Sequence, residues 1–235
     1  EEAKSRYITN NDNLILSLNG YSRFSDEDCR RAGVKPGEYE AACKAIIKHL
    51  IKHINDKFNS PKIDLIYGAS DLGIDKVIKE VSEEHNIISL GFSCPKYMLY
   101  VKDDEIPVYL GKNKDDYAER YVESLDLLIS TGGREQTLSK DILCACRYNK
   151  RIHFVDVLNL LSSTGGVPAT RIGPDGKIHV ENAAAAMGRN ISFFTPGKSQ
   201  IMNFHGDIWD QVFQDVNSVA TEVCRRKMSP ERKFK

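Results

Sequence analysis

Two segments of this sequence share one pattern: a short apolar run, a turn that contains glycine, and the start of a helix. In the first segment, residues 63–67 are followed by Gly68. In the second, residues 127–129 are followed by Gly132 and Gly133. A helix that begins directly after such a turn offers unpaired N–H groups and the positive end of its dipole to an anion. The pattern therefore predicts an α/β sheet whose strands end in anion-binding turns.

The rest of the first two thirds of the chain alternates in the same way. We expect strands at residues 13–18, 63–67, 87–92, 127–129 and 152–155, and helices at residues 38–57, 71–85, 114–124 and 138–148. Strands that alternate with helices pair in parallel through right-handed crossovers. The sequence thus predicts an α/β fold with a Rossmann-like, doubly wound and mainly parallel sheet.

Two regions fit this alternation less well. The charged stretch at residues 24–37 has the length of an ordered loop or a flap over a site. Residues 97–101 and 106–110 both look extended. We expect one of these two segments to join the sheet and the other to be an irregular excursion.

The last third of the chain has a different character. Residues 171–180 are predicted to form a hairpin, because a Pro-Asp-Gly turn lies between alternating residues. Residues 191–194 are a candidate strand, and residues 206–227 form an amphipathic helix. We therefore divide the chain into a Rossmann-like core, residues 1–160, and a C-terminal α+β elaboration, residues 161–235, packed on the core as one domain.

Composition narrows the classes of partner. The chain has 33 basic and 33 acidic residues and no net charge, which argues against a large footprint for duplex nucleic acid. No apolar run approaches the roughly 20 residues that span a bilayer. The N-terminus shows no signal-peptide pattern. None of the 6 cysteines forms a C-x-x-C pair, so we expect reduced thiols, no metal site and a cytoplasmic location.

Three turns together resemble a known family. Residues 16–23 look like a "GSR" turn after a first strand, and residues 68–75 are similar to a "G-A-x-x-G-I-D" turn with one extra residue. Residues 131–137 resemble a "P-G-G-x-G-T-x-x-E" turn. These are turns of the SLOG superfamily, which joins the Smf DNA-processing proteins to the LOG, or "lysine decarboxylase-like", enzymes. The resemblance covers residues 13–155.

This resemblance implies a Rossmann-like sheet that binds a nucleotide or a nucleotide-derived ligand at its strand ends. Some members hydrolyse an N-glycosidic bond, others sense nucleotide signals, and Smf relatives bind single-stranded DNA. One departure bears on catalysis: the position of the LOG glutamate holds Lys140, which is followed by Asp141. A lysine cannot take over the work of that carboxylate.

Our main expectation is a sensor or ligand-binding protein for a nucleotide-derived small molecule, without a cofactor. Gly20, Ser22 and Arg23 are expected to contact one end of the ligand, and the third turn to hold a phosphate with the help of Lys140. On this basis Gly133→Asp would abolish binding in a folded chain. The full expected ligand-binding set is Gly20, Ser22, Arg23, Gly68, Ala69, Ser70, Gly73, Asp75, Gly132, Gly133, Arg134, Gln136, Thr137 and Lys140.

Two alternatives stay open at this point. The chain could be a nucleotide N-glycoside hydrolase or transferase, with Glu135 or Asp141 as the carboxylate and Arg23 or Arg134 at the phosphate. It could also bind single-stranded DNA, although the sequence lacks an obvious stripe of basic and aromatic residues. The C-terminal third would either form a homodimer interface, as we expect of a homo-oligomer, or cover the sheet within one chain.

Overall fold

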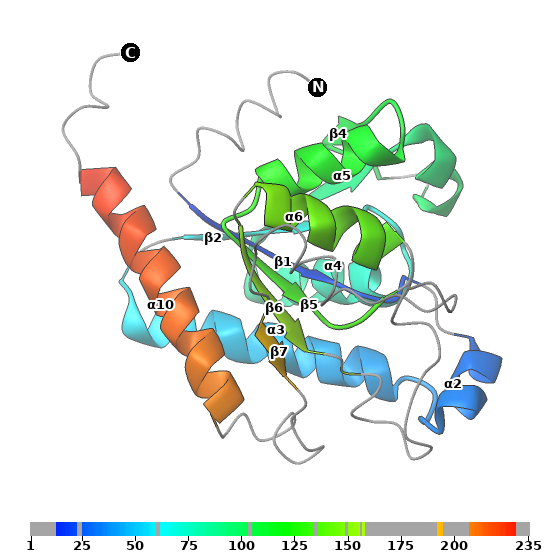
Figure 1. The fold of residues 1–235 in the computed structure, drawn as a ribbon, viewed down its shortest axis with the longest axis horizontal. Helices are drawn as coiled ribbons and strands as arrows, with labels where there is room; N and C mark the ends of the chain where they lie inside the picture. The colour runs from blue at the N-terminus through cyan, green and yellow to red at the C-terminus, as the bar shows by residue number, and fades with distance from the viewer. Residues whose placement is uncertain are drawn as a thin grey trace.

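The computed structural model describes residues 13–22, 25–59, 62–102, 105–133, 136–148, 150–155, 157, 192–194 and 207–228. Within these residues the chain forms one parallel sheet with helices on both faces (Figure 1). The predicted Rossmann-like α/β fold is therefore confirmed. None of the helices in these ranges combines the length and the apolar character that crossing a bilayer requires.

The sheet has seven strands in the order β4-β3-β2-β1-β5-β6-β7, and every neighbouring pair is parallel. The strands are β1 (Leu14–Asn19), β2 (Ile63–Tyr67), β3 (Ile88–Ser93), β4 (Tyr109–Leu110), β5 (Leu127–Ser130), β6 (Arg151–Val155) and β7 (Ser192–Phe194). From β1 the chain builds outward through β2, β3 and β4. It then returns to the other side of β1 with β5 and continues through β6 to β7. The strand order thus reverses between β1 and β5, where ligands of doubly wound sheets bind.

The apolar runs of the sequence become strands because both faces of the sheet are covered. All six residues of β1 are buried, including the polar Ser17 and Asn19. Leu14, Leu16 and Leu18 belong to the core on one face, whereas Ile15 belongs to the core on the other. A strand buried on both sides has no polar-facing positions, so it is apolar almost throughout.

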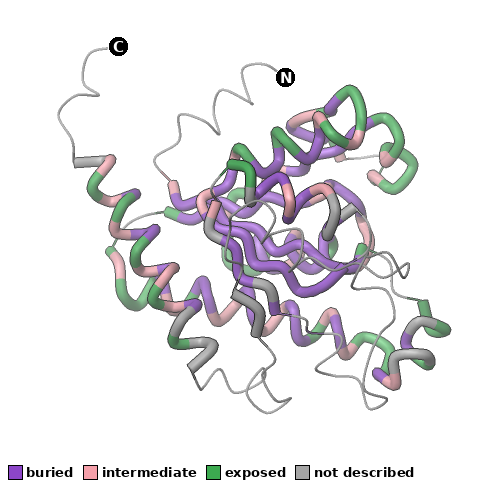
Figure 2. The backbone as a smooth tube through the Cα atoms, in the orientation of Figure 1, coloured by how far each residue is buried: buried purple, intermediate pink, exposed green. Residues whose placement is uncertain are grey.

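Two groups of helices make these cores. One face of the sheet is covered by α3 (Glu38–Lys57), α4 (Gly73–His85) and α10 (Asp207–Met228). The other face is covered by α5 (Lys114–Glu123) and α6 (Leu143–Arg147). A π-helical segment, η2 (Gln136–Ile142), directly precedes α6. Figure 1 shows α3 and α10 on one side of the strands and α5 and α6 on the other. The central strands β1, β2 and β5 are entirely buried between them (Figure 2).

One local prediction is wrong and another is confirmed. The stretch predicted as a loop contains a helix, α2 (Asp26–Ala32). Its acidic residues cluster in the first turn and its arginines in the last, which matches the helix dipole. As predicted, one of the two extended-looking segments joins the sheet and the other does not. Residues 97–101 are the excursion and belong largely to a 3-10 helix, η1 (Pro95–Tyr100), because Pro95 fixes the first turn of a helix. Of residues 106–110, only Tyr109 and Leu110 join the sheet, as β4.

The C-terminal helix covers the sheet within the same chain. Its Val212, Val216 and Val223 are buried in the core that β1 and α3 share. The Phe213 ring lies 4.3 Å from the His53 ring of α3 and nearly parallel to it. β7 extends the sheet in parallel beside β6. The predicted hairpin and the division near residue 160 lie outside the described residues, so both stay predictions.

Candidate ligand-binding site

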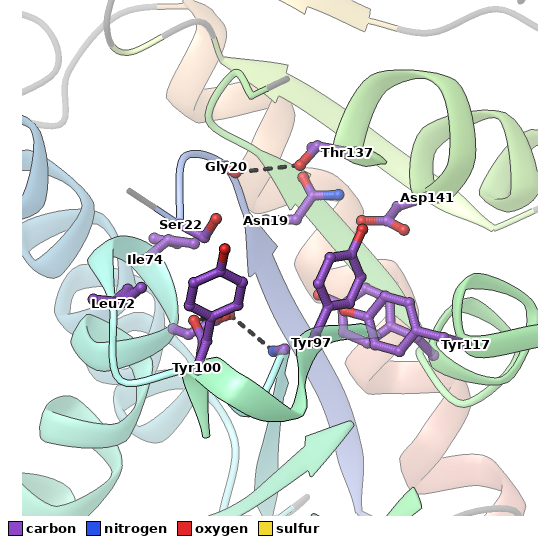
Figure 3. A pocket seen from close by; sticks show the side chains of 14 residues that line it. Asn19, Gly20, Ser22, Leu72, Ile74, Tyr97, Tyr100, Tyr117, Thr137 and Asp141 are labelled. Atoms are coloured by element: carbon purple, nitrogen blue, oxygen red, sulfur yellow. Dashed lines mark hydrogen bonds between the residues drawn. The ribbon is translucent and has the colours of Figure 1, made fainter. Parts of the chain in front are cut away.

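A cavity of about 280 Å³ opens at the carboxyl ends of β1, β2 and β5, beside the reversal of strand order (Figure 3). Each of the three turns that the sequence singled out contributes to its lining. The lining residues are Asn19, Gly20, Ser22, Gly68, Ser70, Leu72, Ile74, Asp75, Tyr97, Tyr100, Tyr117, Tyr121, Thr137 and Asp141. The parallel sheet therefore brings together segments that are more than a hundred residues apart in the chain.

Asn19 ends β1 and carries an amide into this cavity (Figure 3). Its side chain is buried, and neither its nitrogen nor its oxygen has a hydrogen-bond partner among the described residues. The backbone carbonyl of Asn19 does have partners, because the backbone N–H and the Oγ1 of Thr131 both donate to it at 2.9 Å. A buried amide without partners costs stability unless something else bonds to it. This amide is therefore suited to bind a ligand.

A buried hydroxyl of α3 joins the first turn to the third. The backbone N–H of Tyr21 donates to Tyr39 Oη at 3.0 Å, and Tyr39 Oη lies 2.7 Å from Thr131 Oγ1. Because Thr131 gives its only hydroxyl proton to Asn19, Tyr39 is the donor to Thr131. A Cβ atom at Gly20 would overlap both hydroxyl oxygens. Gly20 is thus required by the packing of the turns, whatever its role toward a ligand.

In the second turn, Asp75 faces the cavity and also holds the turn together. Its Oδ1 accepts the backbone N–H of Gly68 at 2.8 Å, and its Oδ2 accepts the hydroxyl of Ser70 at 2.5 Å. Burial raises the pKa of Asp75, while these hydrogen bonds lower it by a smaller amount. Asp75 therefore lies in the first turn of α4, as the sequence predicted, and it also lines the cavity.

The N-terminus of α4 is less open to an anion than the sequence predicted. The backbone N–H of Ile74 donates to the carbonyl of Tyr21 at 3.1 Å. Asp75 already takes the N–H of Gly68. Ala69 is fully buried behind the turn in the left-handed region, with φ of 55°, and Gly73, also at positive φ, starts the helix. A phosphate would have to displace these contacts and approach a buried carboxylate.

In the third turn, Thr137 reaches the cavity and the glycines do not line it. Thr137 Oγ1 donates to the carbonyl of Gly20 at 3.2 Å. Gly133 has φ of 141°, and a Cβ atom there would lie 2.6 Å from the Cβ of Thr137. Gly132 and Gly133 are buried behind Thr137. This corrects the expectation that Gly133→Asp would leave the fold intact, because the new side chain would push Thr137 away.

Asp141 is the predicted catalytic residue that the structure brings to the cavity. It follows Thr137 by about one turn of η2, and only 4% of it is exposed. Burial raises the pKa of Tyr117 and Tyr121, and the negative charge of Asp141 raises it further. Both tyrosines therefore keep their hydroxyl protons near neutral pH. Glu135, the other predicted carboxylate, lies outside the described residues.

Four tyrosines form an aromatic wall that the sequence analysis missed. The wall consists of Tyr97 and Tyr100 from η1 and Tyr117 and Tyr121 from α5. The rings of Tyr117 and Tyr121 are stacked, with centroids 5.8 Å apart and planes 21° apart. In Figure 3, Tyr100 stands on one side of the cavity and Tyr117 on the other. The four-residue spacing within a predicted helix was the signal that could have found the last two.

Contacts fix this wall to the rest of the site. The carbonyl of Tyr100 accepts the backbone N–H of Asp71 at 3.1 Å, which ties η1 to the second turn. The hydroxyl of Tyr121 donates to Ser17, because Ser17 gives its own proton to the carbonyl of Ile66 at 2.7 Å. The backbone of η1 and the ring of Tyr121 are therefore held in place by the chain itself.

The cavity has an acidic and aromatic character. Among its described lining residues two are acids and none is basic. Lys140 forms an ion pair with Asp115 of α5 and does not line the cavity. Arg23 and Arg134 lie outside the described residues, and so does the side chain of Gln136. No group of three metal-ligating side chains is found among the residues that were placed.

The similarity of this chain to known proteins is one of structure. No family model matches the chain, and no curated protein matches it. Among solved structures, the molybdenum cofactor carrier protein of Chlamydomonas reinhardtii is similar at 16% identity and a TM-score of 0.40, over 75% of this chain and 96% of that one. A structural-genomics target, TM1055, is similar at 17% identity and a TM-score of 0.43, over 82% and 99%.

Proposed function

We propose that this chain binds a nucleotide-derived small molecule, with a flat ring of the ligand in the cavity beside β1 and β5. The observation that carries the proposal is that all three glycine-containing turns meet around one cavity where the strand order reverses. Open α/β sheets bind their ligands at this position. The resemblance of the three turns to those of the SLOG superfamily supports the same reading, and we infer that the chain is a distant member of that group.

The chemistry of the lining suits a ring better than a phosphate. Tyrosine faces stack on heterocycles, and each stacked base contributes about 1–3 kcal/mol. Ligand cavities measure about 300–1,000 Å³, so a volume of about 280 Å³ is suited to one base with part of its sugar. The sugar and any phosphate then extend toward Ser22, whose side chain is exposed at the rim.

Thermal shift with nucleosides, mononucleotides and dinucleotides, followed by mass spectrometry of each mixture, tests binding. A ligand at 100 times its dissociation constant stabilises a fold by about 2.7 kcal/mol. For a chain of this size that corresponds to a rise in melting temperature of about 5–10 °C. The absence of a shift with every compound would refute the proposal.

Asn19→Leu is the sharpest variant for this site. Leucine has a similar shape, and the amide that it replaces has no described hydrogen-bond partner, so the free chain should be as stable as wild type or more stable. The same variant should bind the ligand at least about tenfold more weakly, because a hydrogen bond to the ligand is lost. A stable Asn19→Leu chain with unchanged affinity would show that this amide does not face the ligand.

A second candidate function is cleavage of the N-glycosidic bond. Two buried carboxylates, Asp75 and Asp141, line the same cavity, and burial raises the pKa of Asp75 as a general acid requires. Release of free base in the incubated mixtures would support this function, and Asp141→Asn should then stop the release. Binding of intact ligand without release would reject it.

A further inference from the structure

We propose that the ring bound in the cavity presents a hydrogen-bond donor next to an acceptor on one edge, and that the side-chain amide of Asn19 binds this pair. Amino-substituted nitrogen heterocycles and cyclic amides have such an edge, whereas unsubstituted aromatic rings do not. The inference rests on the proposed function, because it concerns the same cavity. It goes beyond that function by naming the chemical class of the ring.

The fold uses the main chain of Asn19 and leaves its amide unbonded. The backbone carbonyl accepts the N–H and the hydroxyl of Thr131 at 2.9 Å. Only 6% of Asn19 is exposed, yet both polar atoms of its amide lack a partner in the part of the chain that the structure describes. The hydroxyl of Thr137 is turned to the carbonyl of Gly20, at 3.2 Å. Because a buried unbonded amide costs stability, this side chain is suited to a molecule other than the chain itself.

The chemistry of an amide defines the partner that satisfies it. Its NH₂ group donates and its carbonyl oxygen accepts, and the two lie side by side in one plane. A single partner bonds to both when it carries an acceptor next to a donor in the same plane. The pairing of asparagine with the edge of adenine in nucleic-acid recognition follows this rule. A phenyl ring would leave both groups of Asn19 unbonded, and a phosphate would leave its oxygen unbonded.

The surroundings of Asn19 favour a ring over a sugar as this partner. Asn19 ends the central strand β1 and its side chain points into the cavity (Figure 3). The stacked rings of Tyr117 and Tyr121, with centroids 5.8 Å apart, line the same cavity and are also buried. Ser22, by contrast, is exposed at the rim. The buried part of the cavity therefore offers aromatic surface and an amide, which suit a polar ring, and the rim is left for the sugar.

The wild-type measurement is titration calorimetry with matched nucleosides or their monophosphates. Adenosine and inosine have a donor beside an acceptor, and purine riboside keeps the ring and sugar but lacks the donor. Cytidine and 2-pyrimidinone riboside form the corresponding pyrimidine pair. We expect the substituted compound that binds to exceed its unsubstituted partner at least about tenfold, because a hydrogen bond to a buried amide is lost. Equal affinities within the pairs would overturn the inference and leave the proposed function standing. Binding of none of these compounds, or of any nucleotide, would remove both.

Asn19→Leu tests whether this amide recognises the edge of the ring. Leucine has a similar shape and no polar atom, so the variant should bind the substituted and unsubstituted members of a pair with equal affinity. If Asn19 bound the sugar instead, both members would weaken equally and the preference would remain, and that result would contradict the inference. Gln214→Leu, at an exposed amide of α10 outside the cavity, is the matched control and should change neither affinity nor preference.

Discussion

Tyr39→Phe should loosen the site without touching the ligand. The Tyr39 side chain is buried in α3 and does not line the cavity, yet its hydroxyl joins two of the turns that do. Phenylalanine keeps the ring and its edge contact with Tyr21, whose ring centroid lies 5.6 Å away. The substitution therefore removes one oxygen and little else.

The magnitude follows from the two hydrogen bonds that join this oxygen to the turns, beside its contact with Cys43 in α3. The backbone N–H of Tyr21 loses its acceptor at 3.0 Å, and a buried donor left unsatisfied costs about 1–3 kcal/mol. Thr131 loses the donor at 2.7 Å, while its own bond to Asn19 remains, and such a loss costs about 1 kcal/mol. We therefore expect Tyr39→Phe to lower the free energy of unfolding by about 2–4 kcal/mol.

Equilibrium unfolding in urea measures this change. The midpoint should fall with an unchanged slope, because the surface exposed on unfolding stays the same. Tyr148→Phe is the control, since 42% of Tyr148 is exposed, and its cost should stay below about 0.5 kcal/mol. A loss at Tyr39 as small as that of the control would refute the reasoning, because it would mean that the Tyr21 N–H finds another partner.

Three further predictions concern single residues. Gly133→Ala should lower the free energy of unfolding by about 2–4 kcal/mol, because the backbone φ of 141° disfavours a side chain and the new Cβ atom would crowd Thr137. Urea titration measures this change, and an unchanged midpoint would contradict the prediction. Asp75→Asn should gain stability relative to wild type as pH rises from the ordinary pKa of 3.8, because burial raises the folded pKa and the wild type therefore loses stability between 3.8 and that raised pKa. Parallel urea midpoints of the two proteins at pH 4 and pH 7 would count against it. Cys43 should resist iodoacetamide in the folded chain and react with it in urea, because burial raises the pKa of its thiol to about 12. Rapid labelling of Cys43 in the native protein, located by mass spectrometry, would contradict this by showing that the thiol is accessible.

Much of the fold could be read from local patterns. The helix expected at residues 38–57 is α3, with the same bounds, and the strand expected at residues 63–67 is β2. These succeed because apolar spacing reports directly on burial. The prediction fails in α2, where a charged stretch was interpreted as a loop. For η1 the sequence predicted an excursion from the sheet but not its helical form, which Pro95 favours.

The candidate site divides in the same way. The sequence located the three turns, since glycine and polar residues after a buried strand mark such turns. It did not locate Asn19 as an unpartnered amide, Tyr39 as the link between turns, or the aromatic wall. Hydrogen-bond partners across the sheet have no sequence signature, because they depend on which strands become neighbours.

The sequence by itself determined the class of fold, the parallel pairing and the positions of the turns, because hydrophobic periodicity and glycine act over a few residues. Only the tertiary structure decided that β1 lies between β2 and β5, which brings Asn19, Asp75 and Asp141 to one cavity. It also decided that the glycines of the third turn serve the packing of Thr137, and that the described lining is acidic and aromatic. Strand order and burial of charge are properties of the whole chain, so no local pattern contains them.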